Sequence, residues 1–124
     1  MAISVVDIAT PAGLKKHRDT DITATKAAVD ATSGSIHAIV IDNTNNAAEA
    51  EYLKLWDAAS GDVTVGTTAP DWVFKVPAAT KVTIVFQSAL AYGTALTAAC
   101  VTTAGTAGTT NPTSDVIVEI LYET

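Results

Sequence analysis

Side chains that carry out chemistry in enzymes are few in this chain and lie far apart. The single cysteine, Cys100, stands in the apolar run LTAACVTTA with no base beside it. This setting predicts a buried small side chain rather than a nucleophile. The chain also lacks the Gly-x-Ser-x-Gly turn that often carries a reactive serine. We therefore expect no catalytic residues and no enzyme activity.

One stretch, HRDTD, carries groups that could bind a cation. It would offer His17, Asp19 and Asp21, but no cysteine or second histidine stands at metal-ligand spacing from them. A solvated run of charges is the favoured interpretation, and the sequence predicts no metal and no cofactor. His37 is expected to lie on the face of a strand. Four carboxylates are expected on the solvent face of strands or at their ends: Glu49, Glu51, Glu119 and Glu123.

Two tryptophans could act as platforms for sugar rings. Trp56 and Trp72 each lie within a β-like run, and a carbohydrate-binding module uses such rings for stacking. Core packing is the favoured role for each, because large aromatic side chains contribute most of their stabilisation when buried.

A single basic cluster stands out on an acidic chain. The 124 residues carry a formal net charge of -6, yet LKKHR places four basic side chains together: Lys15, Lys16, His17 and Arg18. They form either a solvated loop or a contact arm for an acidic partner surface. The negative charge argues against nucleic acid as the main partner. No apolar run approaches the roughly 20 residues that span a bilayer, so no membrane partner is expected either.

Short β-like runs separated by turn signals make up most of the chain. Six strands are predicted at residues 35–42, 51–57, 71–76, 81–87, 96–104 and 115–123, with a possible seventh at residues 3–8. Residues 47–58 are good helix formers, so a short helix stays open there, although a strand is preferred. The pattern predicts an all-β fold, an antiparallel β-sandwich or jelly roll.

The first 33 residues lack this pattern. They are predicted to be an extended N-terminal arm, with a short helix at residues 25–31 as an alternative, ahead of a sandwich domain at residues 34–124. Within that domain Gly-Thr-Thr-x-Pro occurs twice, from Gly66 and from Gly108. Glycine frees the turn and proline favours extended backbone, so the motif is interpreted as a device for entering a strand.

A series of motifs from residue 34 to residue 123 resembles small virion proteins of tailed phages. It contains a strand ending in Asp-Asn-Thr, then YLKL, VGTTAP, a Val-Pro-Ala turn and TAGTA before a last strand. The resemblance implies a non-enzymatic β-sandwich protein of the virion, with a capsid cement or decoration protein favoured. A tail, neck or fibre-associated component is one alternative, and a carbohydrate-binding module is another.

The same resemblance implies the partners and the location. A cement protein would bridge subunits of the major capsid protein, or bind other virion proteins, on the capsid surface. A homo-oligomer is expected, with a trimer favoured.

Overall fold

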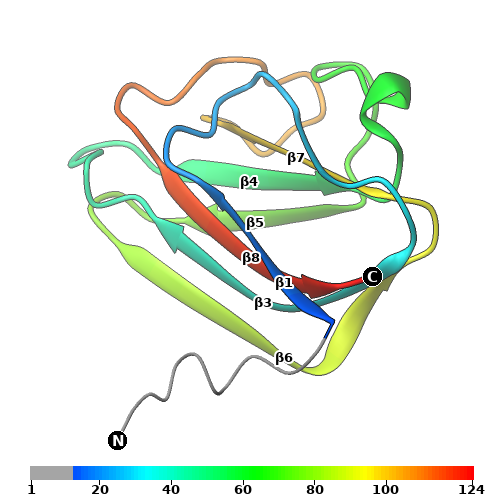
Figure 1. Cartoon of the computed structure of the whole chain (residues 1–124). Helices are drawn as coiled ribbons and strands as arrows, with labels where there is room; N and C mark the ends of the chain where they lie inside the picture. The colour runs from blue at the N-terminus through cyan, green and yellow to red at the C-terminus, as the bar shows by residue number, and fades with distance from the viewer. Residues whose placement is uncertain (1–12) are drawn as a thin grey trace, which may run out of the picture.

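Two antiparallel sheets of four strands pack face to face in the computed structural model, which describes residues 13–124 (Figure 1). One sheet has the order β1-β8-β3-β6 and the other β2-β7-β4-β5. The predicted antiparallel β-sandwich is confirmed. The strands are β1 (Leu14–Asp19), β2 (Ala27–Asp30), β3 (Gly34–Asp42), β4 (Glu51–Trp56), β5 (Trp72–Val76), β6 (Lys81–Tyr92), β7 (Leu96–Val101) and β8 (Ile117–Glu123).

Alternation along the strands builds the core between the sheets. In β8, Val118 and Ile120 are fully buried, whereas Glu119 between them lies on the outer face. In β5, Trp72, Phe74 and Val76 share the inner face, as their spacing predicted. The rings of Phe74 and Phe86 meet edge to face with centroids 6.2 Å apart, which brings β5 and β6 together.

Residues 47–58, for which the sequence left strand and helix open, contain a strand in the structure and no helix. β4 pairs with β5 on one side and with β7 on the other, and Leu53 and Leu55 are fully buried between the sheets. Two sets of ladder hydrogen bonds and this burial override the helix propensity of the local sequence. The helix considered for residues 25–31 is wrong for a similar reason, because β2 pairs with β7 there.

The expectation of an arm over residues 1–33 is wrong from residue 14 onward. β1 pairs with β8 over six residue pairs, and β2 closes the edge of the other sheet. Between these strands Ile22 is 1% exposed, and its N–H donates to the Val116 carbonyl at 3.2 Å. The sandwich therefore includes residues that the sequence placed outside it. The possible strand at residues 3–8 lies outside the described residues.

Loops cover the outer face of the β2-β7-β4-β5 sheet. They gather above β4 and β7 in Figure 1, and they bury a small second core of Trp56, Val63 and Ala99. Lys54 on the same face is 1% exposed and donates to the Gly105 carbonyl. Its burial lowers the pKa of its ammonium group below the usual range.

The two Gly-Thr-Thr-x-Pro loops meet in this cover. Gly66 has a φ of +97°, and a methyl group at its Cα would lie 2.5 Å from Thr109 Cγ2 in the second loop. Glycine is therefore required twice over, for its backbone angle and for the close approach. Each motif does precede a strand, β5 or β8. The contact between the two loops over the outer face of the sheet was not predicted from sequence.

Helical structure in residues 13–124 is limited to a three-residue 3-10 turn, η1 (Ser60–Asp62). Accordingly, this part of the chain holds no helix that is long and apolar enough to cross a membrane.

Replacing Ile22 tests whether the segment between β1 and β2 belongs to the core. Ile22→Ala should lower the free energy of unfolding by about 3 kcal/mol, because it removes a buried side chain and leaves a cavity. Urea unfolding followed by circular dichroism measures the change. Ile117→Ala, at a partly exposed position, is the control and should cost much less. Equal small losses in both variants would show that Ile22 lies outside the core.

Candidate functional site

The outer face of the β1-β8-β3-β6 sheet is the principal candidate for an interaction site. Strand alternation and the pairing register place side chains from all four strands on it, all partly or fully exposed. We call this set the open face. It includes Leu14, Lys16 and Arg18 of β1, Ile117, Glu119, Leu121 and Glu123 of β8, Ser35, Ala38, Val40 and Asp42 of β3, and Lys81, Thr83 and Val85 of β6.

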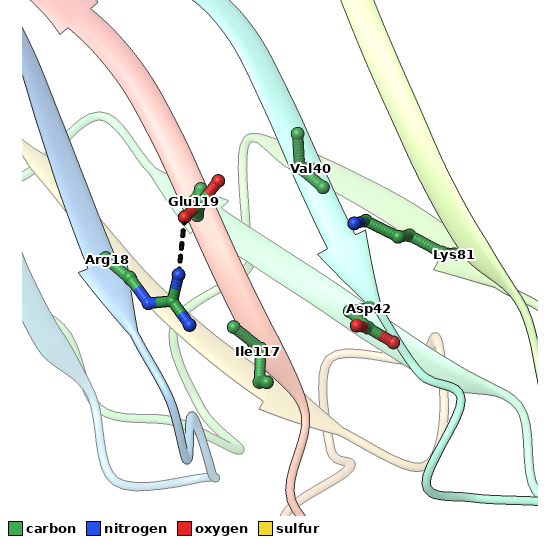
Figure 2. A pocket seen from close by; sticks show the side chains of 6 residues that line it. All are labelled: Arg18, Val40, Asp42, Lys81, Ile117 and Glu119. Atoms are coloured by element: carbon green, nitrogen blue, oxygen red, sulfur yellow. Dashed lines mark hydrogen bonds and ion pairs between the residues drawn. The ribbon is translucent and has the colours of Figure 1, made fainter.

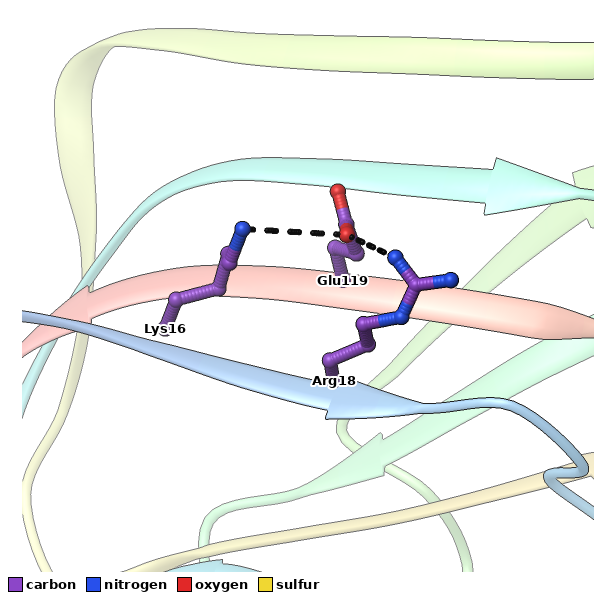
Figure 3. Close-up of polar contacts among 3 residues, drawn as sticks. All are labelled: Lys16, Arg18 and Glu119. Atoms are coloured by element: carbon purple, nitrogen blue, oxygen red, sulfur yellow. Dashed lines mark hydrogen bonds and ion pairs between the residues drawn. The ribbon is translucent and has the colours of Figure 1, made fainter. Parts of the chain in front are cut away.

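A three-residue ion cluster lies on the β1 side of the open face. Arg18 stands opposite Glu119 in the β1–β8 register, and its Nη1 donates to Glu119 Oε2 at 2.8 Å. Lys16 Nζ approaches the same oxygen at 3.8 Å (Figure 3). All three side chains keep contact with solvent, so each pair contributes little to stability. One carboxylate cannot saturate the donors of two cations, and these remain able to bind an acceptor from a partner.

A hollow of about 90 Å³ adjoins the cluster, and Arg18 and Glu119 of the cluster form part of its lining. Figure 2 shows Arg18 and Glu119 on one side of it, Asp42 and Lys81 on the other, and the apolar Val40 and Ile117 between them. Asp42 and Lys81 border it on one side, where hydrogen bonds from Thr44 lower the pKa of Asp42 and Lys81 adds to the effect. The hollow can accept polar groups of a partner surface, although it is too small to enclose an ordinary substrate. Its lining residues are Arg18, Val40, Asp42, Lys81, Ile117 and Glu119.

The open face differs in charge from the chain as a whole. It holds three cations, Lys16, Arg18 and Lys81, and three anions, Asp42, Glu119 and Glu123, on a chain with a formal charge of -6. Among the remaining lysines, Lys26 and Lys54 donate to loop carbonyls on the other side of the sandwich. The open face is therefore balanced in charge on a chain that is acidic as a whole.

The predicted contact residues do not form one cluster in space. β1 is a strand, so Lys16 and Arg18 lie on the open face, whereas His17 stands opposite the core residue Ile120. His17 Nε2 is buried without a hydrogen-bond partner among the described residues. Lys15 lies at the sheet margin, where its Nζ donates to Thr124 Oγ1 at 3.4 Å. The alternation of LKKHRD could have revealed this division if the segment had been interpreted as a strand.

The possible cation ligands do not converge. His17 faces the inner side of β1, and Asp19 Oδ1 accepts the backbone N–H of Asp21 at 3.0 Å. The nearby carboxylate of Asp115 raises the pKa of Asp21. Residues 13–124 contain no group of three or more His, Cys, Asp or Glu side chains placed to hold a metal ion. His37 lies at a bulge in β3, with Nε2 3.3 Å from Glu123 Oε1.

The other candidates for chemistry lie inside the fold. Trp56 is 1% exposed and its Nε1 donates to the Thr68 carbonyl at 3.0 Å, so it cannot stack on a sugar. Trp72 packs against the main core. Cys100 is fully buried as predicted, and this burial raises the pKa of its thiol to about 12. A thiol held in this way is protonated at neutral pH and unreactive.

Glu51 corrects the expectation of solvent-facing carboxylates. It shares the inner face of β4 with Leu53 and Leu55 and is fully buried, and neither oxygen has a hydrogen-bond partner among the described residues. Burial raises its pKa to about 8, and the neighbouring Glu49 carboxylate adds to the shift. The interaction with Glu51 lowers the pKa of Glu49 most. The backbone N–H of Thr113, which donates to the Glu49 carboxylate, lowers it further. The pair of Glu49 and Glu51 lies at one end of the sandwich and is not part of the open face.

Comparison with families and with curated proteins identifies no relative of this chain, since no family model and no curated protein matches it. The geometry of the open face and the resemblance in sequence motifs are therefore what bears on function.

Glu51→Gln should remove a pH dependence of stability. The folded protein holds Glu51 protonated up to about pH 8, whereas an ordinary glutamate ionises near 4.5. Unfolding therefore releases a proton between these values, and the free energy of unfolding falls as the pH rises through this window. Glutamine stays neutral, so the variant should be about 4 kcal/mol more stable than the wild type at pH 8.5 and similar to it at pH 4.5.

Urea unfolding at both pH values measures this difference. Asp62→Asn, at an exposed position of η1, is the control and should leave the pH profile of the wild type unchanged. If Glu51→Gln and wild type have parallel profiles, Glu51 is ionised in the folded protein.

Proposed function

We propose that this chain is a non-enzymatic structural protein of a tailed-phage virion, and that it acts as a capsid cement or decoration protein. In this role it lies on the capsid surface and bridges subunits of the major capsid protein. The motifs of residues 34–123 support the proposal by their resemblance to small phage virion proteins. The β-sandwich agrees with the fold that this resemblance implies.

The unequal outer faces of the two sheets are the observation that carries the proposal. Loops and the second core cover the β2-β7-β4-β5 sheet, whereas the described residues leave the open face on the other sheet exposed. A protein that binds by surface area needs one such face, with apolar groups surrounded by polar ones. Val40, Ile117 and Leu121 supply the apolar part, and the charged side chains lie around them.

Binding on this face would combine apolar contact with charge. Lys16, Arg18 and Lys81 favour an acidic surface on the capsid, which matches the expected partner of the basic cluster. A lasting contact between proteins usually buries well over 1,000 Å² in total. Several open faces acting together in a homo-oligomer would provide an area of this order. The resemblance favours a trimer for this oligomer.

The number of copies per particle tests the proposed location. Quantitative mass spectrometry of purified particles of the encoding phage should give a simple ratio to the major capsid protein, at or near one to one. A few to a few tens of copies would place the chain in the tail, neck or fibres instead. Absence from the particles would overturn both virion roles.

Reversing charge on the open face tests the binding surface. Arg18→Glu should lower the affinity for particles that lack the protein at least tenfold, because it replaces attraction to an acidic surface with repulsion. Co-sedimentation with the particles measures bound protein. Lys75→Glu, at an exposed position of β5 in the other sheet, is the matched control and should bind like the wild type. Equal loss in both variants would show a response to net charge alone.

A further inference from the structure

The two sheets have four edge strands among the described residues. β1 and β6 flank one sheet, and β2 and β5 flank the other. An edge strand presents unpaired backbone N–H and C=O groups, to which another strand can add. Proteins that stay apart usually protect such edges with charge, proline, bulges or short length.

Three of the four edges carry this protection. β1 has Lys15, Lys16 and Arg18 in six residues. β2 has only four residues and a shift of register against β7. β5 has five residues, with Pro70 just before it and Pro77 directly after it.

Between Lys81 and Val85, β6 is less protected than the other edges. It is the longest strand, with twelve residues, and its only charge is on the first of them, Lys81. Its register against β3 shifts between Val85 and Leu90, so only its first five residues form a regular ladder. Val85 is 70% exposed, against 39% for Val73 in β5. A regular edge segment with one charge at its end and an exposed apolar side chain can accept another strand.

The hydrogen-bonding pattern shows which groups of β6 are available. The N–H of Asn43 donates to the Thr80 carbonyl at 2.9 Å, and the β3–β6 register continues regularly from there to Val85. Backbone groups of alternate residues point to opposite sides of a strand. Residues 80, 82 and 84 therefore bond toward β3, and the backbone groups of Lys81, Thr83 and Val85 point to the edge.

We propose that two copies of this chain pair through β6, antiparallel and with a two-fold axis at Thr83. Thr83 of one copy then stands opposite Thr83 of the other, and Lys81 stands opposite Val85. The paired segment is residues 81–85, because the β3–β6 register shifts beyond Val85. The two β1-β8-β3-β6 sheets become one sheet of eight strands. This inference does not depend on the proposed function, and it differs from the trimer that the resemblance favours.

The chemistry of the edge favours a second copy as the occupant. In the proposed register no charged residue faces a like charge, and the methylene chain of Lys81 can cover the exposed Val85 of the second copy. Two threonines opposite one another are a favourable cross-strand pair. The same operation at β1 would bring its three cations together with those of the second copy.

Sedimentation equilibrium of the full chain tests this pairing. The wild type should be a dimer, and Val85→Lys and Thr83→Lys should each raise its dissociation constant at least tenfold, because each brings a further cation to the axis. Ala28→Lys places the same change on an exposed position of the β2 edge and should leave the dimer intact. Thermal unfolding confirms that each variant is folded. A monomeric wild type, or an oligomer that both β6 variants leave unchanged, overturns the proposal.

A cross-link tests the register without depending on affinity. Residues directly opposite in such a pair have Cα atoms about 5.5 Å apart, within the range of a disulfide. Thr83→Cys should form a covalent dimer under mild oxidation, whereas Lys16→Cys on the β1 edge should not, and Cys100 is buried. A Lys16→Cys dimer formed as readily would overturn the register. A chain that dimerises only after removal of residues 1–12 would show that this segment occupies β6 instead.

Discussion

The side-chain period of two along each strand is the constraint on which the rest of this structure depends. With two sheets packed together, every strand presents one face to the core and one face outward. In β8 the buried Val118 and Ile120 make the position of Glu119 on the outside unavoidable. Both the core and the chemistry of the outer faces follow from this register, since a slip of one residue would exchange them.

The two sheets meet this constraint in different ways. β4 has large or charged side chains on both faces, because Lys54 and Trp56 point away from the core that holds Leu53 and Leu55. Trp56 stays buried only because the loops cover it, and Thr68 accepts its N–H. In the other sheet, β3 and β8 bury Ile39, Ile41, Val118 and Ile120 on the inner face. Their outer face mixes charged and apolar side chains that all keep contact with solvent, so it needs no cover of loops.

Much of the fold could be predicted from the sequence, because strands with one apolar face carry a clear period. The positions of β3, β5 and β8 follow from such runs. β1 could not be predicted this way, since Lys15, Lys16 and Arg18 hide its alternation, and β2 has only four residues. Glu51 was missed because a carboxylate is rarely buried in a core, although alternation with Leu53 and Leu55 places it on their face. The division of the basic cluster follows from the same missed strand.

The open face and the β6 edge belong to the same sheet, and this connects the two proposals. Pairing through β6 would place two open faces side by side on one continuous sheet, with Lys81 of each copy near the axis. A partner array that repeats its acidic surface could then bind both faces at once, and the second contact would form at a high effective concentration. Modest contacts such as those of Arg18 and Lys16 would then suffice for lasting attachment. The ion pairs of the open face are weak one by one, but they are compatible with lasting attachment in an assembly.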